Sequence, residues 1–330
     1  MPDTSIVFVV VFFALVFDYI NGFHDTANAI ATSISTRALR PGQAIIMAAI
    51  LNFGGALYST GVAKTIGGEI VSSAAVTQPI IVAALIAAII WNLITWWYGI
   101  PSSSSHALIG GLMGSVLVSK GAEALNFEGI GRIVLSLVLS PIIALITGYF
   151  IMVLMLWIFG RFSPSTLNTG FKRMQLLSAG LMSFAHGSND AQKSMGIITL
   201  ALLSAGYIPA LEVPTWVKLS CATAMACGTA IGGWKIIKTM GGRIFKMEPI
   251  NGFAADLNSA TVIFASTLFN LPVSTTHVVA GSIMGVGSSK RFHAVHWGVA
   301  RQMLMAWVLT IPLSALTGSV IYYLVEIMWP

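Results

Sequence analysis

The sequence has 330 residues, of which 56% are hydrophobic and only 8% are charged, and its mean hydropathy is +0.86. Soluble globular domains carry about 25% charged residues. The composition therefore excludes an ordinary soluble fold and predicts an all-α polytopic protein of the cell membrane, in contact with membrane lipid. The formal net charge is +6. Its lysines and arginines lie in short loops between apolar runs, so they indicate orientation in the membrane and not nucleic-acid binding.

Apolar runs define two sets of predicted helices, one in each half of the chain. The first set covers 4–36, 42–63, 77–99, 102–119 and 132–160, and the second covers 173–205, 215–239, 252–270, 272–288 and 293–327. We therefore divide the chain into a first membrane repeat at 1–160, a short cytoplasmic linker at 161–172 and a second membrane repeat at 173–330.

Three features recur in the same order in both halves. The stretch NGFHD at 21–25 matches HGSND at 186–190, which lies 165 residues later. The stretch PSSSSH at 101–106 matches PVSTTH at 272–277, and Pro141 matches Pro312, each 171 residues later. Matching order and spacing indicate that the two halves are internal repeats.

The segments 77–99 and 102–119 are joined too closely for a water-exposed loop. They form either a full span followed by a small re-entrant loop, or one re-entrant helical hairpin. Positive charge favours the hairpin, because most lysines and arginines then lie inside. Each half then has three spans and one hairpin, so the second half is inverted, an arrangement typical of secondary transporters. Cysteines introduced at Lys120 and Arg243 are expected to label from opposite sides.

Each half carries one polar stripe on an otherwise apolar helix. On a helix at about 100° per residue, the members of each stripe share one face; they are Asp18, Asn21, Asp25 and Asn28 in the first half, and His186, Asn189, Asp190 and Lys193 in the second. Ionisable groups inside a membrane are costly and usually functional. The alternative is that a buried aspartate only forms a structural pair with Lys193 or Arg301. Gly22 and Gly187 suggest a break in each helix, with free carbonyls that suit Na⁺ or a proton relay.

The hydroxyl-rich stretches are predicted to form the tips of the two hairpins. They contain Ser102, Ser103, Ser104 and Ser105 in the first half, and Ser274, Thr275 and Thr276 in the second. Serine and threonine favour helix N-caps, and a helix N-terminus attracts anions. Two facing tips would form a cradle for a tetrahedral oxyanion. Simple capping is the alternative, and His106 and His277 either orient the tips or satisfy carbonyl groups.

The paired motifs resemble the inorganic phosphate transporter (PiT) family, in its bacterial low-affinity branch. The first motif copy is GFHDTANA at 22–29, and the second is HGSNDAQK at 186–193. The resemblance implies symport of inorganic phosphate with Na⁺ or H⁺, commonly by a homodimer. It also implies that Asp25, Asn28, Asn189 and Asp190 serve the coupling cation, while the serines and threonines of the tips hold phosphate.

Two departures from the family pattern favour protons as the coupling ion. His24 stands where Na⁺-coupled members usually carry Asn, and Lys193 stands where they often carry Asn. Histidine titrates near neutral pH. We therefore expect an H⁺-coupled importer of phosphate, either free or as a metal–phosphate complex, in which Asn21, His24 and Lys193 join the coupling set. Na⁺ at the four family positions remains the alternative ion, and no other cofactor is expected.

Other functions are compatible with parts of the pattern. A permease of the same fold would carry sulfate or another oxyanion. An anion channel would not accumulate its substrate, and an intramembrane enzyme would alter it. The sequence has no Walker, HExxH or GxSxG motif, so an ATP-driven transporter or a common intramembrane hydrolase lacks support.

Overall fold

The computed structural model describes residues 4–71 and 75–328. Its regular elements are helices, and one isolated bridge joins Val71 to Leu125. The helices of the first half are α1 (Thr4–Ser35), α2 (Pro41–Ala56), α3 (Gly61–Glu69), α4 (Gln78–Tyr98), α5 (Ser104–Lys120), η1 (Ala122–Ala124) and α6 (Phe127–Phe159). Those of the second half are α7 (Pro164–Ser204), α8 (Thr215–Ile231), α9 (Trp234–Lys238), the π-helix η2 (Thr239–Arg243), α10 (Pro249–Leu268), α11 (Thr275–Lys290), η3 (Phe292–Ala294) and α12 (Trp297–Met328).

Several helices are long and apolar enough to cross a membrane. Among the described residues, α1, α4, α6 and α12 meet this test, and α2 with α3 meets it as a pair bent by 68°. The prediction of an all-α, multi-pass membrane protein is confirmed. α5 and α11 have only 17 and 16 residues, fewer than the roughly 20 that a full span needs.

The largest differences between the predicted and the observed helix boundaries occur at three places. The predicted helix 42–63 is two helices, α2 and α3, separated by a bend. The predicted helix 215–239 stops at Ile231, because Gly232 adopts a φ of 74° that ends α8. Helix α7 begins inside the predicted linker, with Pro164 in its first turn and Ser163 as its N-cap. Proline is favoured in the first turn because an N–H group at that position would have no hydrogen-bond partner within the helix, so nothing is lost by its absence.

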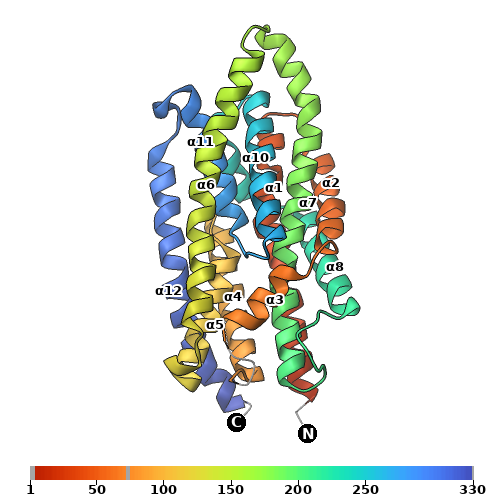
Figure 1. The fold of residues 1–330 in the computed structure, drawn as a ribbon, viewed down its shortest axis with the longest axis vertical. Coiled ribbons are helices and arrows are strands. Elements are labelled where there is room, and N and C mark those ends of the chain that lie inside the picture. The colour runs from red at the N-terminus through yellow and green to blue at the C-terminus, as the bar shows by residue number, and fades with distance from the viewer. Residues whose placement is uncertain (1–3, 72–74, 329–330) are drawn as a thin grey trace.

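The two halves exchange helix partners across the molecule. α1 packs on α8 while α7 packs on α2, and α5 packs on α12 while α11 packs on α6. In Figure 1 the two termini lie at the same end, α1 and α7 run in opposite directions, and the α4–α5 and α10–α11 hairpins enter from opposite ends. These directions agree with the predicted inverted repeat, and the inverted repeat itself stays a prediction. The relation of each half to the membrane faces stays a prediction.

The outer face of the bundle is largely apolar. The most apolar windows of α6 and α12 are only 17% and 22% buried within the chain. Such surfaces suit lipid or another hydrophobic partner. The predicted homodimer stays a prediction.

The predicted helix breaks at Gly22 and Gly187 are wrong. Both glycines lie inside continuous helices, α1 and α7. A Cβ atom at Gly22 would lie 2.3 Å from the Met225 carbonyl oxygen of α8, and one at Gly187 would lie 2.2 Å from the Asn52 carbonyl oxygen of α2. These glycines therefore permit close helix contact, and no unwound carbonyls are offered to an ion there.

Candidate functional site

The two polar stripes and the two hairpin tips form one buried cluster. Asn21 of α1 donates to Asp190 of α7 across 3.5 Å, which joins the stripes of the two halves. Every predicted site residue is almost fully buried; this holds for Asn21, His24, Asp25, Asn28, Asn189, Asp190, Lys193, Ser102, Ser103, Ser104, Ser105, Ser274, Thr275 and Thr276. The sequence pattern therefore identified side chains that the fold brings together.

Asp25 contacts both hairpin tips. Ser104 of the first tip donates to its Oδ2 atom at 2.8 Å, and Thr276 of the second tip donates to its Oδ1 atom at 3.2 Å. Its neighbour His24 lies 2.6 Å away through Nδ1, and the Nε2 atom of His24 lies 3.0 Å from the Thr95 hydroxyl. One carboxylate therefore links α1 to segments that are about 80 and 250 residues distant in sequence.

Asp190 is paired with a lysine inside the cluster. The Lys193 ammonium donates to Oδ1 at 2.7 Å. Thr275 of the second tip donates to Oδ2 at 3.3 Å, and the Nε2 atom of His186 lies 3.5 Å from the same oxygen. The structural pairing that the sequence left open thus exists for Asp190. It coexists with a direct contact to the hairpin tip.

The tip serines cap their helices, as expected from the sequence. Ser103 accepts a hydrogen bond from the backbone N–H of His106 at 3.2 Å, and Ser274 accepts one from His277 at 3.3 Å. The two imidazole rings face each other with centroids 4.6 Å apart, and His277 stacks on Trp307 at 3.8 Å. The histidines therefore join the tips, and His106 Nδ1 also lies 2.7 Å from the Ser103 hydroxyl.

The remaining tip hydroxyls make local contacts that hold the tips in place. Ser105 donates to the Val273 carbonyl of the opposite tip at 3.1 Å. Ser102 donates to Thr95 at 2.9 Å. Thr95 thus bridges a tip serine and His24, a link that sequence reasoning missed because this threonine lies in an apolar helix without any motif.

The two motif asparagines have different surroundings. Asn28 donates to the Thr276 hydroxyl at 2.7 Å, and its Oδ1 atom has no hydrogen-bond partner among the described residues. Asn189 braces the second hairpin, since it donates to Thr267 at 3.1 Å and accepts from the Val273 N–H at 3.3 Å. Asn189 therefore positions the tip, and Thr267 is another residue that the sequence did not reveal.

Two further buried carboxyl groups lie next to α1, one toward each end of the helix from Asp25. Asp18 belongs to α1 itself, and Asp256 belongs to α10. Asp18 is buried beside Ser194 and Cys221, and its oxygens make no hydrogen bond of good geometry within the described chain. Asp256 accepts from Thr32 at 2.5 Å and from Ser178 at 3.4 Å. Asp18, Asp25 and Thr32 are each seven residues apart, so they recur about every 10 Å along one helix face.

Arg301, which the sequence suggested as a partner for a buried aspartate, is exposed on α12. Among the described residues no group of three or more histidine, cysteine, aspartate or glutamate side chains could hold a metal ion. The cluster combines hydroxyl donors at two helix N-termini with ionisable carboxyl groups and the Lys193 ammonium.

This fold and site define a multi-pass membrane transport protein of the cell membrane. A family model described as the phosphate transporter family matches residues 21–318. A probable low-affinity inorganic phosphate transporter of Bacillus subtilis is 53% identical over 97% of each chain. One of Rhizobium meliloti is 44% identical over 96% of this chain and 95% of its own. The chain belongs to the phosphate transporter family, and is a transporter and not an enzyme.

A solved structure of a sodium-dependent phosphate transporter has the same fold. It superposes with a TM-score of 0.91 and covers 98% of this chain and 100% of its own, at 24% sequence identity.

Proposed function

We propose that this chain is a secondary active symporter that imports inorganic phosphate with protons by alternating access. Family membership and the names of its bacterial relatives support phosphate as the cargo, free or as a metal–phosphate complex. The observation that carries the coupling proposal is the contact of Asp25 with both hairpin tips.

The tips supply the anion site. Two helix N-termini approach each other there, and each provides N–H groups and hydroxyl donors. Such donors bind a tetrahedral oxyanion without burying a fixed positive charge. Phosphate can also donate a hydrogen bond, which sulfate cannot do, and the carbonyl oxygen of a protonated Asp25 can accept it, so the site favours phosphate.

Coupling follows from competition for the same hydroxyl groups. While Asp25 is ionised, Ser104 and Thr276 direct their protons to its oxygens. A bound anion would lose these donors and would also be repelled by the carboxylate. Protonation of Asp25 removes both obstacles, so proton and phosphate each favour binding of the other. Reorientation of the hairpins then releases both on the inner side.

The surroundings of Asp190 support protons over sodium. Lys193 occupies one carboxylate oxygen, while Thr275 and Asn21 contact the other. An ammonium group thus already provides the positive charge that a sodium ion would bring. The close contact of His24 with Asp25 adds a second group that can exchange a proton.

Sodium coupling is the second candidate, and one observation favours it. The Oδ1 atoms of Asn21 and Asn28 are buried without a hydrogen-bond partner within the described chain. Both are hard oxygen ligands of the kind that suits Na⁺. In this alternative, the ion would bind beside Asp25 at one of these two amide oxygens.

Asp18 and Asp256 extend the proposal to a relay across the membrane. Asp18 lies about 10 Å along α1 from Asp25, toward the end of the molecule where the chain termini lie. Thr32, which donates a hydrogen bond to Asp256, lies about 10 Å from Asp25 in the opposite direction. We assign Asp18 to proton entry toward Lys193 and Asp190, and Asp256 to proton exit.

Uptake of labelled phosphate into proteoliposomes tests the proposal. We expect concentrative uptake that is driven, in the absence of Na⁺, by a proton gradient directed into the vesicles (acidic outside). Excess sulfate should not affect this uptake. Inhibition by sulfate would identify a broader oxyanion permease, and a strict requirement for Na⁺ would support the second candidate. Equilibration without accumulation under either gradient would contradict symport.

A further inference from the structure

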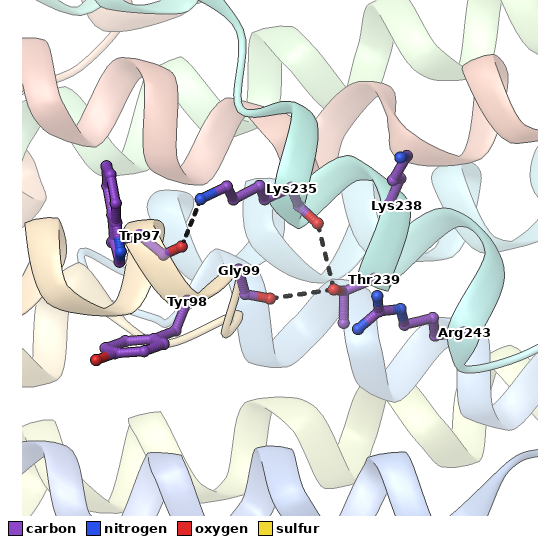
Figure 2. A pocket seen from close by; sticks show the side chains of 7 residues that line it. All are labelled: Trp97, Tyr98, Gly99, Lys235, Lys238, Thr239 and Arg243. Atoms are coloured by element: carbon purple, nitrogen blue, oxygen red, sulfur yellow. Dashed lines mark hydrogen bonds between the residues drawn. The ribbon is translucent and has the colours of Figure 1, made fainter.

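A basic cavity lies against the first hairpin tip, outside the cluster described above. Its volume is about 350 Å³, and its lining consists of Trp97, Tyr98, Gly99, Lys235, Lys238, Thr239 and Arg243. Figure 2 shows the end of α4 on one wall and the α9–η2 segment on the other. Three of its seven lining residues are cations, and none is an aspartate or glutamate.

Two hydrogen bonds fasten the basic segment to the hairpin. Lys235 donates to the Trp97 carbonyl at 2.7 Å and lies 4.5 Å from the centre of the Trp97 ring. Thr239 donates to the Gly99 carbonyl at 3.0 Å, and both bonds are drawn in Figure 2. A cation at the C-terminus of α4 is favourable by itself, so helix capping accounts for Lys235.

Capping does not account for the other two cations. Neither Lys238 nor Arg243 forms an ion pair with a carboxylate in the part of the chain that the structure describes. Like charges held together in one cavity raise its potential and attract anions. Arginine and lysine are also the side chains that most often bind phosphate oxygens in proteins.

The cavity continues toward the transport site. A neighbouring cavity, also about 350 Å³, shares Tyr98, Gly99, Thr239 and Arg243 with the first and reaches Pro101 and Gln302. Pro101 directly precedes the tip serines. Arg243 thus lines both cavities, on the side of the hairpin tip that the distribution of basic residues predicts to face the cytoplasm.

We propose that Lys238 and Arg243, with Lys235, form a second anion site that binds a phosphate group behind the first hairpin tip. The inference deepens the proposed function, since the phosphate group is either cargo leaving the tips or the headgroup of an anionic lipid. The 64% and 72% exposure of Trp97 and Tyr98 is compatible with a lipid headgroup at the membrane interface.

Cysteine labelling tests the charge and the ligand together. In a C227S background, which removes the exposed native thiol, K238C is reacted with negatively and positively charged methanethiosulfonates in neutral detergent. A potential of several kT predicts that the ratio of anionic to cationic rates is about tenfold higher at K238C than at K246C, a matched exposed lysine outside the cavity. An equal ratio at the two positions would overturn the proposal.

Protection then identifies the source of the phosphate group. Slower labelling of K238C, but not of K246C, on addition of inorganic phosphate would identify cargo. Protection only by added phosphatidylglycerol would identify a lipid headgroup, and protection by neither would refute the site. The same protection experiment in a D25N background separates the cavity site from the proposed coupling mechanism. If the cavity binds a phosphate group by itself, protection of K238C persists in D25N although coupled transport is lost.

Discussion

Replacing Asp25 with asparagine tests the coupling mechanism most sharply. Asparagine keeps the size of the side chain and resembles a protonated aspartate. It therefore fixes the state in which Ser104 and Thr276 are free to bind phosphate. We expect D25N to bind phosphate without a proton, to exchange it across the membrane, and to lose accumulation driven by a pH gradient.

The size of the effect follows from the geometry. The Ser104 hydroxyl lies 2.8 Å from Asp25, and an anion that takes the hydrogen bond of this hydroxyl at a similar distance lies with its charge about 5 Å from the carboxylate. At an effective dielectric constant of about 20, two unit charges at that separation repel by about 3 kcal/mol. This energy corresponds to a factor of roughly 100 in phosphate affinity.

Calorimetric titration with phosphate from mildly acidic to mildly alkaline pH measures this factor. At a pH where Asp25 is ionised, D25N should bind phosphate about 100-fold more tightly than the wild-type protein. Where the wild-type affinity falls because Asp25 loses its proton, D25N should show only the change caused by the ionisation of phosphate itself. E128Q, which neutralises an exposed carboxylate in the first turn of α6, is the matched control and should behave as wild type. A D25N protein with the wild-type pH dependence would refute the mechanism.

Three further substitutions test other parts of the account. D18N should slow pH-driven uptake but leave phosphate exchange unchanged; equal loss of both would remove Asp18 from the relay. K193Q leaves the buried Asp190 carboxylate without its ion-pair partner and should lower the free energy of unfolding by about 3–5 kcal/mol, as measured by thermal unfolding. The double variant D190N/K193Q should regain this stability but should not transport phosphate. G187A places a methyl group against the α2 backbone and should destabilise by about 1–3 kcal/mol, while G54A, which meets nothing within 4 Å, should not.

The sequence was most informative where a motif occurs twice. The matched stretches at 21–25 and 186–190, and the two hydroxyl-rich tips, identified side chains that the structure gathers into one buried cluster. Hydropathy predicted most of the helices, because a continuous apolar run of about 20 residues is long enough to cross the membrane as a helix.

Other features depend on tertiary contacts that a single sequence does not encode. Gly22 and Gly187 look like helix breakers in isolation, but neighbouring backbones approach them so closely that only glycine fits. Thr95 and Thr267 become part of the site only because the hairpins fold against α1 and α7. The bend between α2 and α3 occurs in a run that hydropathy treats as continuous.

Proton movement with phosphate tests the central claim most directly. Proteoliposomes loaded with a fluorescent pH indicator are given an inward phosphate gradient in sodium-free buffer, and the internal pH is recorded. The account predicts internal acidification that follows phosphate uptake in the wild type and disappears in D25N. Phosphate uptake without a change in internal pH, or uptake that occurs only when Na⁺ is added, would contradict it.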